Sequence, residues 1–152
     1  MRIDSHAHGS VVNLNESPGE YITRCRRDGI DGIVLIADPE PLFSARDRLG
    51  SFVISVPIID MDQAGPDEVR RLFDRGAEGI KFFLPKHAYG DERYFPLYEA
   101  IKERDGVAVF HTGYVMHDAD YSSRYRVKLD DMRAGHIDTI ERNVPHLKVL
   151  MG

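Results

Sequence analysis

The sequence predicts an α/β protein built on a parallel sheet, and two observations support this fold class. Short runs rich in β-branched and other apolar residues recur along the chain, and polar or Gly/Pro residues close each of them. Every run except the last is followed by a stretch with the apolar spacing of a helix. Because such helices connect consecutive strands, the strands are expected to lie parallel in one sheet.

Six strands and five helices follow from these runs. The most apolar run, GIVLIA, ends directly before Asp38, and the others end at similar boundaries. Three helices have a glycine just past a charged last turn, as a helix C-cap needs: Gly29, Gly76 and Gly106. In chain order the elements are strand 2–6, helix 17–28, strand 32–37, helix 41–49, strand 52–59, helix 65–75, strand 79–84, helix 95–104, strand 107–111, helix 134–143 and strand 148–151.

The composition is that of an ordinary globular domain. Of the 152 residues, 42% are hydrophobic and 30% are charged, which suffices for one buried core. The sequence has no low-complexity segment or Ser/Gly-rich linker, so residues 1–152 are expected to belong to one domain. The net charge of -5 argues against a nucleic acid or anionic membrane partner, and we expect a small-molecule substrate.

The single cysteine, Cys25, and the N-terminal residues indicate the compartment. One cysteine excludes both a disulfide framework and a zinc site made of cysteines. The N-terminal MRIDSHAHG has no basic segment followed by an apolar run, and no stretch reaches the roughly 20 apolar residues that span a bilayer. We therefore expect a cytoplasmic protein.

Three histidines fall at the predicted carboxyl ends of strands, where parallel α/β folds bind their ligands. His6 and His8 are two residues apart on the first strand and so face the same side, with Asp4 one layer deeper. His111 closes the apolar run GVAVFHTG. A single such histidine is better interpreted as a core or surface group, but three at equivalent positions favour a metal site. Neutral imidazoles are zinc ligands, so these three are the candidate metal ligands.

Lys81 is the fourth candidate, because it interrupts the buried strand GIKFFLP. A lysine inside such a strand must be paired or chemically altered to avoid a large desolvation cost. Three roles are open: a carbamylated bridging ligand, a clamp for a substrate anion, and a structural ion pair. A plain cation ranks slightly ahead of a metal ligand.

The loops after the fourth and fifth strands carry further polar candidates. The stretch from 112 to 133 is far longer than the usual connection of about 2 to 6 residues, and long loops in such units are usually functional. It contains His117, which together with Lys81 is a candidate catalytic residue. It also contains Arg124, a candidate contact for a substrate carboxylate. Tyr89, in the loop after the fourth strand, is a second candidate substrate contact.

Four segments together resemble the amidohydrolase-related (amidohydrolase 2) branch of the amidohydrolase superfamily of metal-dependent hydrolases. They are IDSHAHG, AEGIKFFLPKHAYGDERYFPLYEAI, VAVFHTG and MRAGHIDTIERNVPHLKVLMG. The resemblance implies a distorted (β/α)8 TIM-like barrel carrying one or two divalent ions. The family's HxH motif corresponds to His6 and His8, its fifth-strand histidine to His111, and its fourth-strand lysine, a bridging ligand only in some members, to Lys81.

The chain departs from this family in length. A barrel of this type needs about 250 residues, and the elements above make only the first five and a half βα units. The sixth-strand histidine and the last-strand aspartate of the family are not among these residues. We therefore expect residues 1–152 to be the N-terminal portion of a single barrel domain, with an open sheet edge that favours a homo-oligomer.

The resemblance implies a metal-dependent hydrolase in which zinc, or manganese, activates water to attack a carbonyl in a small carboxylate-bearing substrate. A metal-dependent decarboxylase of the same branch is the nearest alternative, and a metal-free lactonase is another. A noncatalytic α/β binding module of flavodoxin-like size is the alternative from a different class. Against that module stands the absence from the sequence of a GxGxxG or GxxxxGK phosphate loop.

Overall fold

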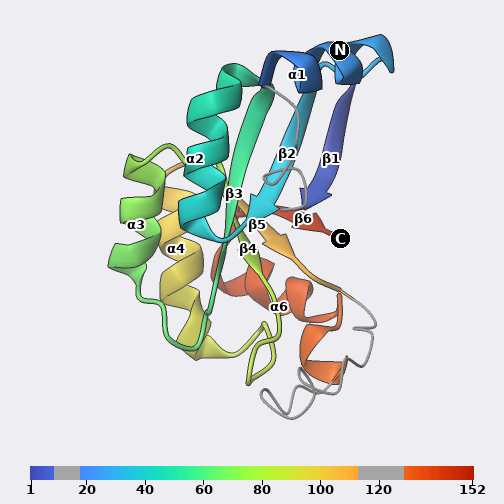
Figure 1. Ribbon diagram of the computed structural model, residues 1–152. Helices are drawn as coiled ribbons and strands as arrows, with labels where there is room; N and C mark the ends of the chain where they lie inside the picture. Colours follow the sequence, from blue (N-terminus) through green and yellow to red (C-terminus); the bar gives the residue numbers. More distant parts are fainter. Residues whose placement is uncertain (9–17, 113–128) are drawn as a thin grey trace, which may run out of the picture.

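The structure, a computed structural model, describes residues 1–8, 18–112 and 129–152 (Figure 1). Its six parallel strands form one sheet in the order in which they occur in the chain. The sheet curls into a half-barrel, and helices α2, α3 and α4 cover its outer side (Figure 1). The strands are β1 (Ile3–His8), β2 (Gly32–Ala37), β3 (Val53–Ile59), β4 (Gly79–Phe82), β5 (Val107–Phe110) and β6 (Lys148–Met151).

The helices confirm the predicted alternation of strands and helices. Proline occupies the first turn of α2, α3 and α4, where its missing N–H costs nothing. The α-helices are α1 (Pro18–Arg27), α2 (Pro39–Leu49), α3 (Pro66–Asp74), α4 (Phe95–Glu103) and α6 (His136–Asn143), and the 3-10 helices are η2 (Gly50–Phe52), η3 (Glu92–Tyr94) and η4 (Leu129–Met132). Within the described ranges, no helix is long and apolar enough to cross a membrane.

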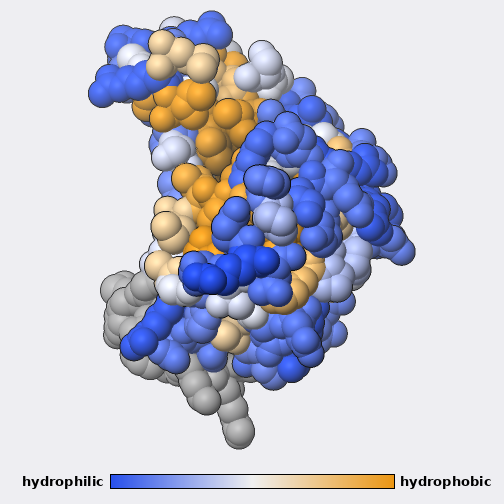
Figure 2. Space-filling view, turned by 180° about the vertical axis from the view of Figure 1, so that it is seen from behind, coloured by the Kyte–Doolittle hydropathy of each residue, from blue (hydrophilic) through white to orange (hydrophobic). Residues whose placement is uncertain are grey.

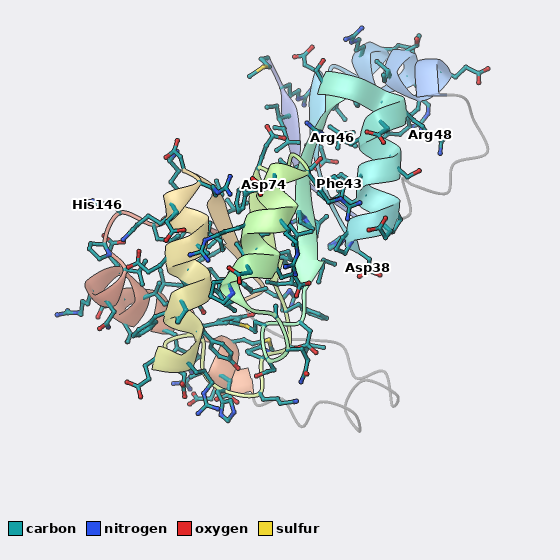
Figure 3. All side chains as sticks on the ribbon, turned by 90° about the vertical axis from the view of Figure 1, so that its left-hand side faces the viewer. Asp38, Phe43, Arg46, Arg48, Asp74 and His146 are labelled. Carbon is teal, nitrogen blue, oxygen red and sulfur yellow. The ribbon has the colours of Figure 1, made fainter. Side chains whose placement is uncertain are left out.

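Between the sheet and the helices lies the outer part of the core. Alternate residues of β4 and β5, such as Phe82 and Phe110, are fully buried there and pack with Tyr98 of α4. The three ring centroids lie 5.3 to 5.6 Å apart, and aromatic pairs of this kind add about 0.5 to 1.5 kcal/mol beyond their burial. Phe43, labelled in Figure 3, lies on α2, and its ring centroid is 4.4 Å from the guanidinium carbon of Arg75, which joins α2 to the end of α3.

The inner face of the sheet has a smaller apolar cluster of its own. Ile36 of β2, Val56 of β3 and Val109 of β5 are buried together there. Because side chains alternate along a strand, residues of the same parity as Val109 also face inward, and these include His111. Figure 2 shows hydrophobic residues gathered along the hollowed side of the molecule, opposite the charged helical layer.

The two edge strands, β1 and β6, expose apolar side chains. Ile3 on β1 and Leu150 and Met151 on β6 are all more than a third exposed. Edge strands also present unpaired backbone groups, which is the usual basis of association between sheets.

Candidate metal centre at the carboxyl ends of the strands

His6 and His8 lie side by side on β1. They flank Ala7, which is buried in the outer core with β2 and α2, so both imidazoles face the inner side of the sheet. Their ring centroids are 4.8 Å apart and the ring planes meet at 69°. His6 is half-buried and His8 is exposed. Two imidazoles this close can offer nitrogen atoms to one ion.

The surroundings of His6 favour its neutral form. Burial, the positive charge of Lys81 and the neighbouring His8 lower the pKa of His6 below its usual 6.5, against a smaller opposing effect of Asp4. A histidine must be deprotonated to bind a metal, so this shift suits a ligand. It also places Lys81 and His6 close enough to interact electrostatically across the inner face.

Asp4 makes its hydrogen bond to the backbone of β1. Its Oδ1 accepts a hydrogen bond of 3.1 Å from the backbone N–H of His6. The pairing of β1 with β2 shifts register between Asp4 and Ala7, and this hydrogen bond holds the irregular stretch. The sequence predicted that Asp4 lies one layer deeper than the two rings. In the structure, its carboxylate accepts a hydrogen bond from the backbone N–H of His6.

Gly152 brings the ends of three strands together. A Cβ at Gly152 would stand 3.0 Å from both Cε1 and Nδ1 of His6 on β1. The Gly152 N–H donates to the carbonyl of Phe110 at 3.0 Å, and Thr112 donates to the Gly152 carbonyl at 3.0 Å. His111 lies between Phe110, the last residue of β5, and Thr112. The structure therefore places His6 and His111 at the same end of the sheet, with Gly152 between their strands.

His111 begins the connection that leaves β5. Its N–H donates to the Phe82 carbonyl at 3.1 Å, and its ring meets Phe83 edge-on, with centroids 4.9 Å apart at 89°. Within the described residues, no three His, Cys, Asp or Glu side chains are arranged so as to hold a metal ion. The structure thus forms the His6–His8 pair and places His111 at the same mouth without closing a three-ligand group. Imidazole donors fit zinc by their chemistry.

Lys81 is buried on the inner face, with only 2% of its surface exposed. Its register neighbours are Ile58 on β3 and Val109 on β5, both apolar. Among the described residues Nζ has no hydrogen-bond partner, and burial lowers the pKa of Lys81 from 10.5 to about 8. Of the three expected roles, the structural ion pair therefore has no counterpart in the described part of the chain.

Tyr89 corrects a prediction. Its side chain is fully buried and has no exposed surface with which to contact a substrate. Its hydroxyl donates to the carbonyl of His111 at 3.0 Å and lies 3.4 Å from that of Phe82. The residue that the sequence suggested as a substrate contact instead lies beneath a candidate ligand. Burial of this kind cannot be inferred from its position in a polar loop.

The other predicted candidates lie elsewhere. His117 and Arg124 are outside the described residues. His136 begins α6, where its Nε2 lies 2.8 Å from the Asp130 carbonyl oxygen. His146 precedes β6 and so lies at the amino end of that strand, away from the candidate metal centre (Figure 3).

Asp62 and Tyr94 form a contact at the same end of the sheet that the sequence analysis missed. Tyr94 is buried, and its hydroxyl donates to Oδ1 of Asp62, while Oδ2 of Asp62 accepts from the Lys86 N–H at 2.9 Å. Together these bonds tie the loop after β3 to the loop after β4. The available signal was the pair of aspartates, Asp60 and Asp62, directly after the third apolar run.

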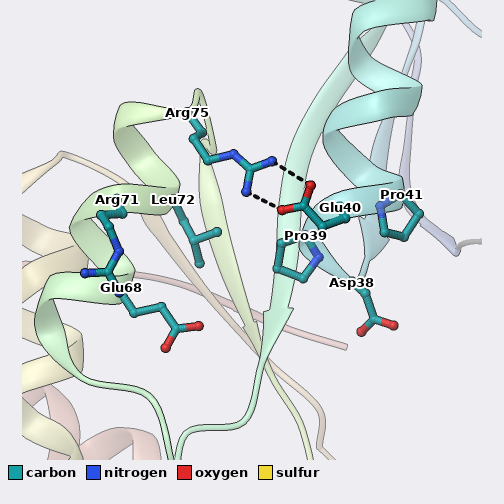
Figure 4. A pocket seen from close by; sticks show the side chains of 8 residues that line it. All are labelled: Asp38, Pro39, Glu40, Pro41, Glu68, Arg71, Leu72 and Arg75. Carbon is teal, nitrogen blue, oxygen red and sulfur yellow. Dashed lines mark hydrogen bonds and ion pairs between the residues drawn. The ribbon is translucent and has the colours of Figure 1, made fainter.

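A pocket of about 580 Å³ lies on the helical side, between α2 and α3 (Figure 4). Within it, Arg75 donates to both carboxylate oxygens of Glu40, at 2.6 and 3.2 Å. None of the strand-end histidines lines it, so it is separate from the candidate metal centre. The lining residues are Asp38, Pro39, Glu40, Pro41, Glu68, Arg71, Leu72 and Arg75.

Three solved structures share this fold over nearly the whole chain. A 5-carboxyvanillate decarboxylase from Sphingomonas paucimobilis matches with a TM-score of 0.68 at 12% identity, over 99% of this chain and 67% of that one. A 2,6-dihydroxybenzoate decarboxylase from Rhizobium matches with a TM-score of 0.65 at 12% identity, over 99% and 65%. An amidohydrolase II protein matches with a TM-score of 0.64 at 13% identity, over 98% and 65%.

These likenesses confirm the predicted fold, a partial (β/α) barrel. The chain spans about two thirds of the length of the solved structures it matches. No protein-family model matches the chain, and no curated protein matches it in sequence. Because both decarboxylases and an amidohydrolase share the fold, the fold by itself does not select a reaction.

Proposed function

We propose that the chain carries the metal-binding end of an amidohydrolase-type active site that hydrolyses a C–N or C–O bond beside a carbonyl in a small carboxylate-bearing substrate. The observation that carries this proposal is the pair His6 and His8, whose rings lie 4.8 Å apart at the carboxyl end of β1. A lowered pKa at His6 keeps its nitrogen available for a metal at neutral pH.

His6, His8 and His111 are the proposed ligands of one divalent ion. Zinc is the first choice, because it binds imidazole readily, and manganese is the second. When bound, the ion would polarise the substrate carbonyl and lower the pKa of a water molecule. His117 and Arg124, outside the described residues, stay candidates for catalysis and for substrate binding.

Lys81 is the proposed binding group for the substrate carboxylate. It shares the inner face with His6, and its pKa of about 8 leaves the amine protonated at neutral pH. A buried cation without a partner among the described residues is costly, and a carboxylate would supply that partner. Orienting the substrate in this way would present its carbonyl to the metal-binding histidines.

Decarboxylation is the second candidate, because solved structures of the same fold include a 5-carboxyvanillate decarboxylase and a 2,6-dihydroxybenzoate decarboxylase. The same histidines would hold the metal, and Lys81 would again attract a carboxylate. The two reactions differ in their products. Hydrolysis consumes water at the carbonyl, whereas decarboxylation releases carbon dioxide.

The metal assignment is tested by zinc content and zinc affinity of the purified chain. His6→Ala combined with His8→Ala is expected to abolish stoichiometric zinc binding. The matched control is His146→Asn, because His146 is exposed at the opposite end and its φ of 68° is tolerated by asparagine. Equal zinc binding by the double variant and the wild type would overturn the assignment.

The reaction is tested on a panel of hydroxybenzoates and carboxylate-bearing amides and lactones, with zinc supplied. Carbon dioxide release and incorporation of oxygen from labelled water are followed in parallel. Incorporation of labelled oxygen without carbon dioxide is the result expected for the hydrolase. Release of carbon dioxide without incorporation of labelled oxygen would overturn the hydrolase proposal in favour of a decarboxylase.

A further inference from the structure

A single buried tyrosine joins the ends of β4 and β5 beneath His111. The Tyr89 hydroxyl donates to the His111 carbonyl at 3.0 Å and lies 3.4 Å from the Phe82 carbonyl. Phe82 ends β4 and His111 directly follows β5, and the His111 N–H itself donates to the Phe82 carbonyl at 3.1 Å. The tyrosine oxygen therefore sits at the point where the two strands pass into their loops.

The backbone of Tyr89 is anchored on both sides. Its N–H donates to the Asp131 carbonyl at 3.1 Å, in η4, and its own carbonyl accepts a hydrogen bond of 2.8 Å from the Tyr98 hydroxyl, in α4. The next residue, Gly90, packs so closely on α6 that an added Cβ would lie 3.1 Å from Cβ of Thr139. Three elements, η4, α4 and α6, thus hold the backbone around Tyr89.

The ring of Tyr89 is also enclosed. It is fully buried and meets Phe110 edge-on, with centroids 4.8 Å apart and ring planes at 69°. A fixed donor on the carbonyl of His111 limits rotation of the peptide group that follows this residue.

We propose that Tyr89 is a positioning residue for His111: it holds the backbone of that histidine so that the imidazole faces the mouth where His6 and His8 lie. This inference rests on the proposed function, because it matters for chemistry only if His111 binds the metal. Tyr89 acts through His111 and contacts neither substrate nor metal.

The test compares Tyr89→Phe with Tyr94→Phe in the full 152-residue chain. Each variant removes one hydroxyl from a buried tyrosine that donates a hydrogen bond, but Tyr94 donates to Asp62 and not to His111. Zinc affinity is measured by competition with a chromogenic chelator. Loss of a supporting hydrogen bond behind a ligand typically costs about 10- to 100-fold in metal affinity, which is the loss expected for Tyr89→Phe alone.

A second measurement does not depend on metal. Three-bond NMR couplings report the χ1 rotamer of His111, which is expected to be single in the wild type and in Tyr94→Phe and averaged in Tyr89→Phe. An unchanged rotamer, or a zinc affinity no lower than that of Tyr94→Phe, would overturn the positioning role.

The two measurements separate this inference from the proposed function. If His6→Ala with His8→Ala leaves zinc binding intact, the proposed metal centre fails, and the His111 rotamer still decides whether Tyr89 positions it. If that double variant loses zinc while Tyr89→Phe retains full affinity, only the positioning role fails.

Discussion

The imidazole of His6 lies against the backbone of Gly152, although the two residues stand at opposite ends of the chain. A Cβ on Gly152 would come within 3.0 Å of two ring atoms of His6, closer than side-chain carbons normally approach. Hydrogen bonds to Phe110 and Thr112 hold Gly152 in place. The position of this histidine therefore depends on a glycine at the end of β6.

Gly152→Ala is expected to displace the His6 ring and to weaken zinc binding several-fold. The glycine backbone is held by two hydrogen bonds, so the ring is the part that must move. Zinc affinity and the ring chemical shifts of His6 measure the effect. Gly135→Ala is the matched control, because nothing lies within 4 Å of its added Cβ. Identical behaviour of the two variants would show that the contact is unimportant.

Lys81→Met is expected to stabilise the fold at pH 7. The wild-type amine is protonated there but buried between Ile58 and Val109, and a shift in pKa from 10.5 to about 8 corresponds to a cost of about 3 kcal/mol. Methionine keeps the length of the side chain without the charge. Urea unfolding measures the free energy. A variant no more stable than the wild type would mean that the lysine has a stabilising partner.

The stability advantage of Lys81→Met should shrink as pH rises. Below pH about 8 the amine is protonated in both folded and unfolded states, and the folded state bears the full cost. Between about 8 and 10.5 the folded state has lost this proton and the unfolded state has not, so the wild type gains stability relative to the variant. Lys86→Met, which removes an exposed lysine, is the matched control.

Gly79→Ala is expected to destabilise the sheet by about 1 to 3 kcal/mol, the usual cost of overpacking. Its added Cβ would lie 2.7 Å from the backbone oxygen of Val107 on β5, so two paired strands would have to separate. Thermal or urea unfolding measures the change. Gly19→Ala in α1, whose added Cβ meets nothing within 4 Å, should not lower stability, and similar losses in both would contradict the argument.

Arg75→Met is expected to lower the melting temperature by a few degrees and to reduce its dependence on salt. Arg75 binds Glu40 through two hydrogen bonds and covers the ring of Phe43, so it links α3 to α2 (Figure 4). Arg142→Met, which removes an ion pair within α6, is the control. A larger effect at Arg142 would show that the link between helices is unimportant.

Local sequence signals predicted most element boundaries, because strands and helices here follow runs of clear periodicity. The predicted strands 32–37 and 148–151 coincide with β2 and β6. Two departures have physical reasons. β1 continues to His8, because Ala7 and His8 still pair with β2, and α2 begins at Pro39, because proline is accommodated in a first helical turn.

The candidate site was predictable only in part. His6, His8, Lys81 and His111 could be proposed from the sequence because each lies on or directly after an apolar run, and parallel strands end at one edge of a sheet. Their roles stay predictions. Tyr89 was misinterpreted, because its burial comes from packing against residues of α4, β5 and η4 that are distant in sequence.

By itself the sequence determined the alternation of strands and helices, the placement of three histidines near strand ends and that of a lysine within a strand, because periodicity and position along a strand are local properties. Only the tertiary structure decided which groups meet. The curl of the sheet brings Gly152 to His6. The strand register places Lys81 between Ile58 of β3 and Val109 of β5, both apolar. The aromatic core places the Tyr89 hydroxyl under His111. These contacts join residues far apart in the chain, and no local pattern encodes them.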